Sequence, residues 1–317
     1  MKARIRNLLK TLWMVVVAVF VVRYVVRNWD ELYDTVASFS ALVLVSTVLV
    51  TMAGKAFVCA QSRVTTRAFG ARFTLRESLW MYSASDLVKY VPGGVWNALA
   101  RVRLYNARGM AASAGTRAFA LEKYWMLTGA VFTGLMVMAP EMLGRVGIEL
   151  HGAAAWAVRI VVLIGWGPAM FIGARVAGAR VHPRSVALAM ANELAMAVLF
   201  GLGVSIPLSA VDAKISTATA IGAFSIGRGM GYVAVFAPAG IGVREVVTIW
   251  ALGGGHNAAT DTMLIAMAVN RVMTLVADLA SFATNLAVRP ARVVAEQDPD
   301  DETVLDAATE SGADPGF

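Results

Sequence analysis

Apolar and polar stretches alternate along the chain, and six of the apolar stretches are long. They cover residues 8–27, 40–60, 116–138, 155–174, 185–207 and 261–287. An α-helix rises about 1.5 Å per residue, so about twenty residues cross the hydrocarbon core of a bilayer. The pattern therefore predicts an all-α integral membrane protein with about six transmembrane helices.

Two other segments, 77–100 and 216–253, are interrupted by proline and glycine. The breaks fall at Pro92-Gly93-Gly94 and at Pro238-Ala239-Gly240. The helix before the first break, ESLWMYSASDLVKY, is too short to cross a bilayer at about 1.5 Å per residue. We therefore expect both segments to be re-entrant, broken helical hairpins, each of which enters and leaves the membrane on the same side.

Basic residues in the loops predict the orientation, because cytoplasmic loops of membrane proteins collect Lys and Arg. Bases precede the first predicted span and acids follow it, which predicts a cytoplasmic N-terminus. Basic clusters flank segment 77–100, so this hairpin is expected to open to the cytoplasm and 216–253 to the outer face. The last span delivers Arg289 and Arg292 to the cytoplasm, so both termini are predicted to be cytoplasmic.

The two halves of the chain repeat one order of elements. Each half contains two spans, then a broken hairpin, then a third span, within about 1–140 and again within about 150–290. The second half starts from the opposite side of the membrane. We expect an inverted repeat within one polytopic membrane domain, residues 1–290. The alternative is two unrelated kinks, because Gly and Pro are common in membrane helices. Residues 291–317 are acidic and poor in large apolar residues, which predicts a disordered cytoplasmic tail.

Composition agrees with a membrane protein. Hydrophobic residues make up 58% of the 317 residues, and only 15% are charged, whereas soluble domains carry about 25% charged residues. The formal net charge of +7 follows from the basic cytoplasmic loops, so it does not indicate nucleic-acid binding.

Few residues are suited to metal or covalent chemistry. Cys59 is the single cysteine, and His151, His182 and His256 lie apart from one another and outside the apolar stretches. We therefore expect no metal site, no cofactor and no catalytic constellation.

Ionisable residues gather around the two breaks. Such residues are costly inside a bilayer, so they need an ionic partner or a polar cavity. The bases near the breaks outnumber the acids, which favours an anion as ligand, and a lipid phosphate is the most abundant anion there. The helix N-termini that follow the breaks also favour anions. These residues are Lys55, Asp86, Lys89, Arg101, Glu122 and Lys123 in the first half and Glu193, Arg228, Arg244, Glu245, Arg271 and Asp278 in the second.

Four stretches resemble a known family. KYVPGGVWNALARVRLY (89–105), LEKYWMLTG (121–129), APAGIGVREVV (237–247) and NRVMTLVADL (270–279) are similar to the lysylphosphatidylglycerol synthase transmembrane-region family. Its best-known member is the flippase domain of the bacterial multiple peptide resistance factor. The resemblance covers about residues 1–290, and it implies a bacterial plasma-membrane protein that moves lipids between leaflets without the synthase domain.

The resemblance also implies a set of substrate-binding residues. Two motifs carry most of them, KY-x-PG in the first half and P-x-G-x-G-x-RE in the second, and Glu122 and Arg271 are the buried acid and base. The motif residues are Lys89, Tyr90, Pro92 and Gly93, followed by Pro238, Gly240, Gly242, Arg244 and Glu245.

Together these patterns predict a lipid flippase or scramblase. Its substrate would be a phosphate-bearing lipid, either a polyprenyl-phosphate sugar or an aminoacyl- or glyco-phospholipid, and a lipid-synthesising enzyme is a candidate partner. Arg244, Arg271 and Lys89 would hold the phosphate, and Glu122, Glu245 and Asp86 would hold those bases in place. The alternatives are an intramembrane lipid-modifying enzyme and a non-transporting assembly partner. Transport of labelled lipid by the purified protein would separate the three.

Overall fold

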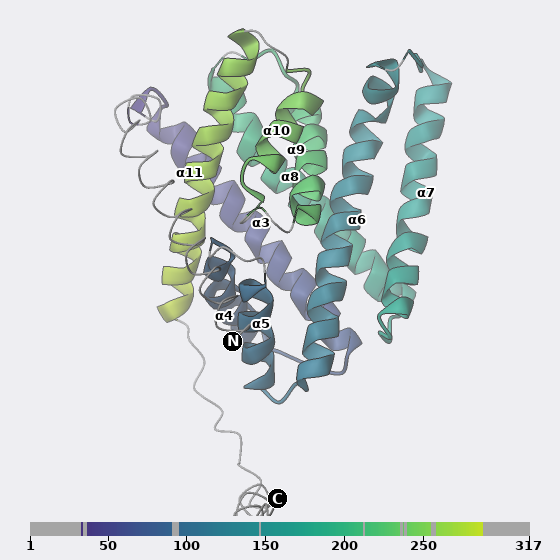
Figure 1. Cartoon of the computed structure of the whole chain (residues 1–317), viewed down its shortest axis with the longest axis vertical. Coiled ribbons are helices and arrows are strands. Elements are labelled where there is room, and N and C mark those ends of the chain that lie inside the picture. The colour runs from purple at the N-terminus through teal and green to yellow at the C-terminus, as the bar shows by residue number, and fades with distance from the viewer. Residues whose placement is uncertain are drawn as a thin grey trace, which may run out of the picture.

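The computed structural model describes residues 33, 37–90, 95–145, 147–211, 213–234, 237, 240–254 and 258–287. These residues form helices joined by short loops, with no strand among them (Figure 1). The predicted span 8–27, the predicted tail 291–317 and the motif residues Pro92, Gly93 and Pro238 lie outside the described residues.

Five helices are long and apolar enough to cross a membrane. Each lies where the sequence predicted a span and extends it by a few residues at one end or both. The chain is therefore an all-α, multi-pass membrane protein. The five helices are α3 (Ala41–Ala68), α6 (Ala112–Arg145), α7 (Ala153–Val176), α8 (Pro183–Ala210) and α11 (Ala258–Ala287).

The remaining helices are short and occupy the two segments that the sequence predicted to be broken. The first segment holds α4 (Leu75–Asp86), the 3₁₀ turn η1 (Leu87–Tyr90) and α5 (Trp96–Asn106). The second holds α9 (Thr217–Val233) and α10 (Val243–Ala251). Even α9, with 17 residues, reaches only about 26 Å at 1.5 Å per residue. None of the four therefore crosses the roughly 30 Å hydrocarbon core by itself.

Local sequence explains where the short helices begin. Thr74 and Glu77 form a capping box at the start of α4, in which the side chain of each residue accepts a hydrogen bond from the backbone N–H of the other. Ser216 caps α9 by accepting a hydrogen bond from the Thr219 backbone N–H at 3.1 Å.

The two broken segments lie toward opposite ends of the molecule. In Figure 1, α4 and α5 occupy the lower part and α9 and α10 the upper part, while α3 crosses diagonally behind them. α3 packs along α8, α9 packs against α6, α8 and α10, and α11 packs against α3, α8 and α4. The short helices of the two segments thus approach the middle of the bundle from below and from above in Figure 1.

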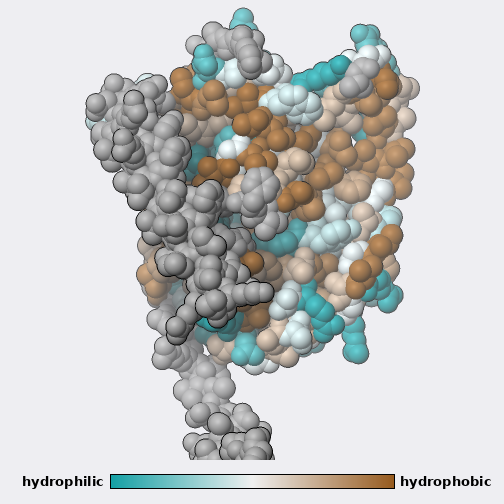
Figure 2. All heavy atoms as spheres, viewed as in Figure 1, coloured by the Kyte–Doolittle hydropathy of each residue, from teal (hydrophilic) through white to brown (hydrophobic). Residues whose placement is uncertain are grey.

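Glycine allows α6 and α9 to pack closely. A Cβ atom at Gly222 would lie 2.7 Å from Cβ of Val137, closer than real side chains approach. Small residues serve this purpose at helix contacts in membranes, where van der Waals packing replaces the hydrophobic effect. By contrast, α7 lies at the edge of the bundle and exposes large apolar side chains, among them Trp156, Val161 and Ile164. Figure 2 shows this apolar surface over α6 and α7.

Candidate functional site

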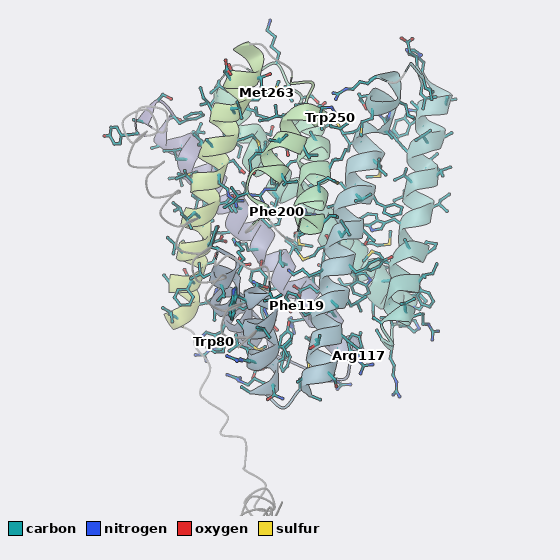
Figure 3. The ribbon with its side chains drawn as sticks, viewed as in Figure 1. Trp80, Arg117, Phe119, Phe200, Trp250 and Met263 are labelled. Atoms are coloured by element: carbon teal, nitrogen blue, oxygen red, sulfur yellow. The ribbon has the colours of Figure 1, made fainter. Side chains whose placement is uncertain are left out.

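A cavity of about 430 Å³ lies between the two broken segments. We call it the central cavity. Its walls come from both breaks, including Lys89 and Tyr90 of η1 and Gly240 before α10, and from the long helices α3, α6, α8 and α11. Figure 3 labels two of its aromatic lining residues, Phe200 near mid-height and Phe119 below it. In Figure 2, polar residues interrupt the apolar surface at this height, beside α6.

The lining of the central cavity is mainly basic. Six basic side chains reach it, whereas Asp86 is the one acidic residue among the described lining residues. The six bases are Lys55, Lys89, Lys123, Arg228, Arg244 and Arg271. Their acidic partners, described below, lie mostly behind the lining. The cavity therefore presents positive charge to whatever enters it.

Two lysines and two aspartates form a network on one side of the cavity, which we call the lysine–aspartate network. Asp86 Oδ2 lies 2.9 Å from Nζ of Lys55 and 2.8 Å from Nζ of Lys89. Asp278 on α11 pairs with the same two lysines, at 2.8 Å for Lys89, and accepts a hydrogen bond from the Tyr90 hydroxyl at 2.5 Å. The network is electrically balanced, and it ties α3, α4, η1 and α11 together.

A second group joins α5 to α6. Arg101 on α5 lies 3.6 Å from Glu122 on α6, and both side chains are almost completely buried. Lys123 lies 3.4 Å from the same carboxylate and extends to the cavity. Arg101 also donates to the Ser85 hydroxyl at 2.5 Å and lies over the Tyr82 ring. Glu122 thus balances one of two bases.

A third pair lies behind the opposite wall. Nη2 of Arg228 on α9 is 3.6 Å from Glu193 on α8, and its guanidinium lies over the Phe200 ring at 5.5 Å. Arg228 lines the cavity, and Glu193 is fully buried behind it. A Cβ atom on Gly129 of α6 would lie 2.5 Å from a carboxylate oxygen of Glu193, so glycine makes room for this acid.

The fourth group lies at the start of α10. Glu245 Oε1 lies 3.4 Å from Arg244 and 3.7 Å from Arg271 on α11. The other oxygen of Glu245 accepts from the Gly242 backbone N–H at 2.8 Å, which begins the helix. Gly242 has a φ of +84°, a conformation that glycine adopts without strain. One carboxylate here faces two arginines, both of which line the cavity.

Two ion pairs in each half join elements in the same order along the chain, with the signs reversed. In the first half a base on α3 (Lys55) pairs with an acid on α4 (Asp86), and in the second an acid on α8 (Glu193) pairs with a base on α9 (Arg228). Likewise, a base on α5 (Arg101) pairs with an acid on α6 (Glu122) in the first half. In the second half an acid on α10 (Glu245) pairs with a base on α11 (Arg271).

The structure brings most of the predicted site residues together. Lys89, Tyr90, Gly240, Arg244 and Arg271 line the central cavity, as do the secondary candidates Lys55, Asp86, Lys123 and Arg228. Gly242 and Glu245 lie beside it at the start of α10, and Arg101, Glu193 and Asp278 lie behind its wall. Pro92, Gly93 and Pro238 are not among the described residues.

The partners of Glu122 differ from those that the sequence suggested. Glu122 was expected, with Glu245 and Asp86, to hold the phosphate-binding bases Arg244, Arg271 and Lys89 in place. In the structure Glu122 instead contacts Arg101 and Lys123 of the first half, while Arg271 contacts Glu245, and both of these lie in the second half. The reason is proximity, because the second helix of each broken segment packs against the long helix that follows it, α5 against α6 and α10 against α11.

Sequence reasoning missed the aromatic and amide lining of the cavity. Phe119, Phe200, Phe224 and Tyr232 line it, together with Asn97 and Asn270. Asn270 donates to the Gly203 carbonyl at 2.7 Å. An aromatic residue in an apolar helix carries no local signal that separates a cavity wall from a packed core. The amides could have been found, because a polar side chain in a span is unusual.

Comparison with models of protein families gives no match, and no curated protein matches the chain. Within the described ranges, no three His, Cys, Asp or Glu side chains gather in a way that could hold a metal ion. The geometry of the central cavity is therefore the observation on which a functional assignment depends.

Proposed function

We propose that the protein is a lipid flippase or scramblase that moves a phosphate-bearing lipid between leaflets. The observation that carries the proposal is the central cavity, in which six basic side chains and one acidic one line a space between two broken helical segments of a membrane protein. A volume of about 430 Å³ is in the range of small-molecule sites. It suits a lipid headgroup, while the acyl or prenyl chain remains in the bilayer.

The two broken segments are proposed to be re-entrant hairpins of an inverted repeat. Their short helices approach the middle of the bundle from opposite ends (Figure 1). The sign-reversed ion pairs described above support an equivalence of α3–α6 with α8–α11. In transporters with such repeats, the substrate binds near the bilayer midplane, where the broken helices of the two halves meet.

Arg244, Arg271 and Lys89 are proposed to hold the phosphate. Arg244 and Arg271 both line the cavity and lie next to the same carboxylate, that of Glu245, so their guanidinium groups are close enough to bind one ligand. The planar fork of an arginine matches two phosphate oxygens at once. The charge of Lys89 is balanced by Asp86 and Asp278. Its main contribution to phosphate binding would therefore be a hydrogen bond and not an added positive charge.

The proposed setting is the bacterial plasma membrane, with both termini in the cytoplasm, and the resemblance to the lysylphosphatidylglycerol synthase transmembrane-region family supports it. The substrate lipid is either a polyprenyl-phosphate sugar or an aminoacyl- or glyco-phospholipid. An enzyme that synthesises this lipid is the proposed partner.

The test is lipid translocation by the purified protein in liposomes, with transport normalised to the amount of folded protein. Labelled phosphate-bearing lipids should become accessible from the opposite leaflet faster than in empty liposomes. Arg117→Gln is the matched control, because Arg117 is exposed at the end of α6, away from the cavity (Figure 3). Liposomes that show the same rate with and without protein would rule out the proposal.

A further inference from the structure

We infer that the central cavity accepts a phosphate lipid whose headgroup carries hydroxyl groups, as a sugar does, and rejects one whose headgroup carries an ammonium group. The inference rests on the proposed function and chooses among its substrates. A sugar-bearing lipid fits, whereas an aminoacyl lipid does not, because its aminoacyl group carries a protonated amine. Two independent observations carry the inference, namely the surroundings that the cavity offers to a cation and the uncharged hydrogen-bonding groups in its lining.

The carboxylates around the cavity are engaged by bases of the protein. Asp86 is the one acid among the described lining residues, and its Oδ2 lies within 2.9 Å of two lysines. Behind the wall, the side chains of Glu122, Glu193 and Asp278 are fully buried. Glu245 contacts two arginines through Oε1, and its Oε2 accepts from a backbone N–H. An entering ammonium group would therefore have to displace a base of the protein to reach a carboxylate.

Aromatic rings also attract cations in proteins, and five rings of the lining already have a cation of the protein over them. The distances from the charged group to the ring centroid are 5.1 to 5.9 Å. A second cation at such a ring would lie close to the first, and like charges repel. These rings therefore offer little to a cationic headgroup. The pairs are Lys55 with Tyr82, Lys89 with Tyr90, Lys123 with Phe119, Arg228 with Phe200 and Arg244 with Phe224.

Uncharged polar groups of the lining suit hydroxyls. Asn97 Oδ1 is buried and has no hydrogen-bond partner in the described part of the chain, while its Nδ2 donates to the Ser85 carbonyl at 2.9 Å. The hydroxyls of Thr51 and Thr274 donate to backbone carbonyls of their own helices at 2.7 and 2.8 Å, so their oxygen atoms can still accept. A sugar hydroxyl can donate to these oxygens and accept from the lining lysines and arginines.

The lining therefore discriminates between a polyol and an ammonium group. An ammonium group only donates, and it brings a positive charge next to six bases. Like charges placed together at a binding site lower affinity and are a common source of specificity. A polyol brings no charge, and it can use both the donors and the acceptors of the lining. The inference concerns the group attached to the phosphate and not the phosphate itself.

The test compares three lipids that share two oleoyl chains and a phosphodiester. Phosphatidylinositol carries a ring of hydroxyls, phosphatidylethanolamine carries an ammonium group, and N-acetyl-phosphatidylethanolamine lacks that positive charge. Native mass spectrometry of the full chain in detergent, with the three lipids in equal amounts, measures which lipid binds. Phosphatidylinositol should bind about tenfold tighter than phosphatidylethanolamine or more, and the N-acetyl lipid should lie between them. Equal binding of phosphatidylinositol and phosphatidylethanolamine would refute the inference.

A substitution at Thr274 locates the hydroxyl contacts in the cavity. Thr274→Val keeps the shape of the side chain and removes its oxygen, so phosphatidylinositol should bind about threefold more weakly, as expected for one neutral hydrogen bond. Thr284→Val is the matched control, because Thr284 lies exposed on the same helix, outside the described lining, and makes the same bond to the carbonyl four residues earlier. Equal binding by the two variants would exclude Thr274 as a contact of the headgroup.

A carboxylate at the same position tests the charge. Thr274→Glu places an acid in the cavity, so the ratio of phosphatidylethanolamine to phosphatidylinositol bound should rise about tenfold, as for one charge-assisted hydrogen bond. Thr284→Glu should leave this ratio unchanged. An equal ratio in the two variants would show that the charge of the lining does not select the headgroup. The lipid comparison on the unaltered chain decides the inference even where a variant does not fold.

The outcomes separate this inference from the proposed function. If the protein translocates phosphate lipids but binds phosphatidylinositol and phosphatidylethanolamine equally, the flippase stands and the headgroup selection is wrong. If it prefers phosphatidylinositol and the preference responds to Thr274, but no lipid moves, the binding site stands and transport is wrong.

Discussion

The lysine–aspartate network leads to a quantitative prediction about Asp278→Asn. Asp278 has a fully buried side chain, and its carboxylate pairs with Lys55 and Lys89 and accepts from the Tyr90 hydroxyl. Asparagine keeps the shape of the side chain but removes its charge. Two lysines then face Asp86 alone, so one buried positive charge has no partner.

The expected cost follows from the burial of these groups. Removing one partner of a buried ion pair destabilises a protein by about 3–5 kcal/mol, because the remaining charge is left uncompensated. At roughly 2–4 °C per kcal/mol for a domain of about 150–250 residues, the melting temperature should fall by about 6–20 °C. Thermal unfolding of the purified protein in one detergent, followed by size-exclusion chromatography, measures this shift.

A second substitution separates the charge from the packing. Lys55→Met in addition to Asp278→Asn leaves Asp86 and Lys89 as a single balanced pair at 2.8 Å. The double variant should recover most of the lost stability, since replacing a buried pair by apolar groups is often close to neutral. A single variant within about 1 kcal/mol of the unaltered chain, or a double variant no more stable than the single one, would refute this reasoning.

Three further predictions concern the cavity, the helix packing and the topology. Arg244→Ala should insert and fold but stop lipid translocation in liposomes. Arg244→Lys should keep only part of the translocation, because lysine retains the charge but lacks the planar guanidinium fork. Full transport by the alanine variant would show that Arg244 is not part of the site. Gly222→Ala should lose about 1–3 kcal/mol of stability through contact with α6. Gly144→Ala, which meets no atom within 4 Å, should lose none, and equal melting temperatures would contradict the close packing. Cysteines at Ser209 and Ser113, at opposite ends of the bundle, should be labelled from outside the cell only at Ser209, and the reverse pattern would invert the topology.

The spans could be predicted because their signal is local. Lipid demands an uninterrupted apolar run of a given length, so hydropathy alone located α3, α6, α7, α8 and α11. The two broken segments were also predictable, because proline and glycine interrupt them where the apolar runs become short. The ends of the helices were predicted less accurately than their positions. α6 begins at Ala112 and ends at Arg145, beyond the predicted span 116–138, because a helix can continue into polar surroundings at the membrane surface.

The candidate site was predictable as a set of residues but not as a set of pairs. Charged residues inside apolar segments are costly, which by itself marks Lys55, Asp86, Glu193, Arg228 and Asp278 as residues with partners. Which acid pairs with which base depends on distances between helices that are far apart in sequence. The prediction that Glu122 holds the phosphate-binding bases did not include Arg101, which α5 brings to within 3.6 Å of Glu122.

The sequence alone determined that this chain is a multi-pass helical membrane protein with two broken segments and an excess of buried bases. These properties follow from the run lengths, the breaks and the charges, each of which acts over a few residues. Only the tertiary structure decided that residues from both broken segments line one cavity and that four ion-paired groups of described residues surround it. Such facts depend on contacts between α3, α6, α8, α9, α10 and α11. The physical reason is that the energy of an ion pair depends on the distance between the two charges in space. The order of residues along the chain specifies that distance only for residues that are close in sequence.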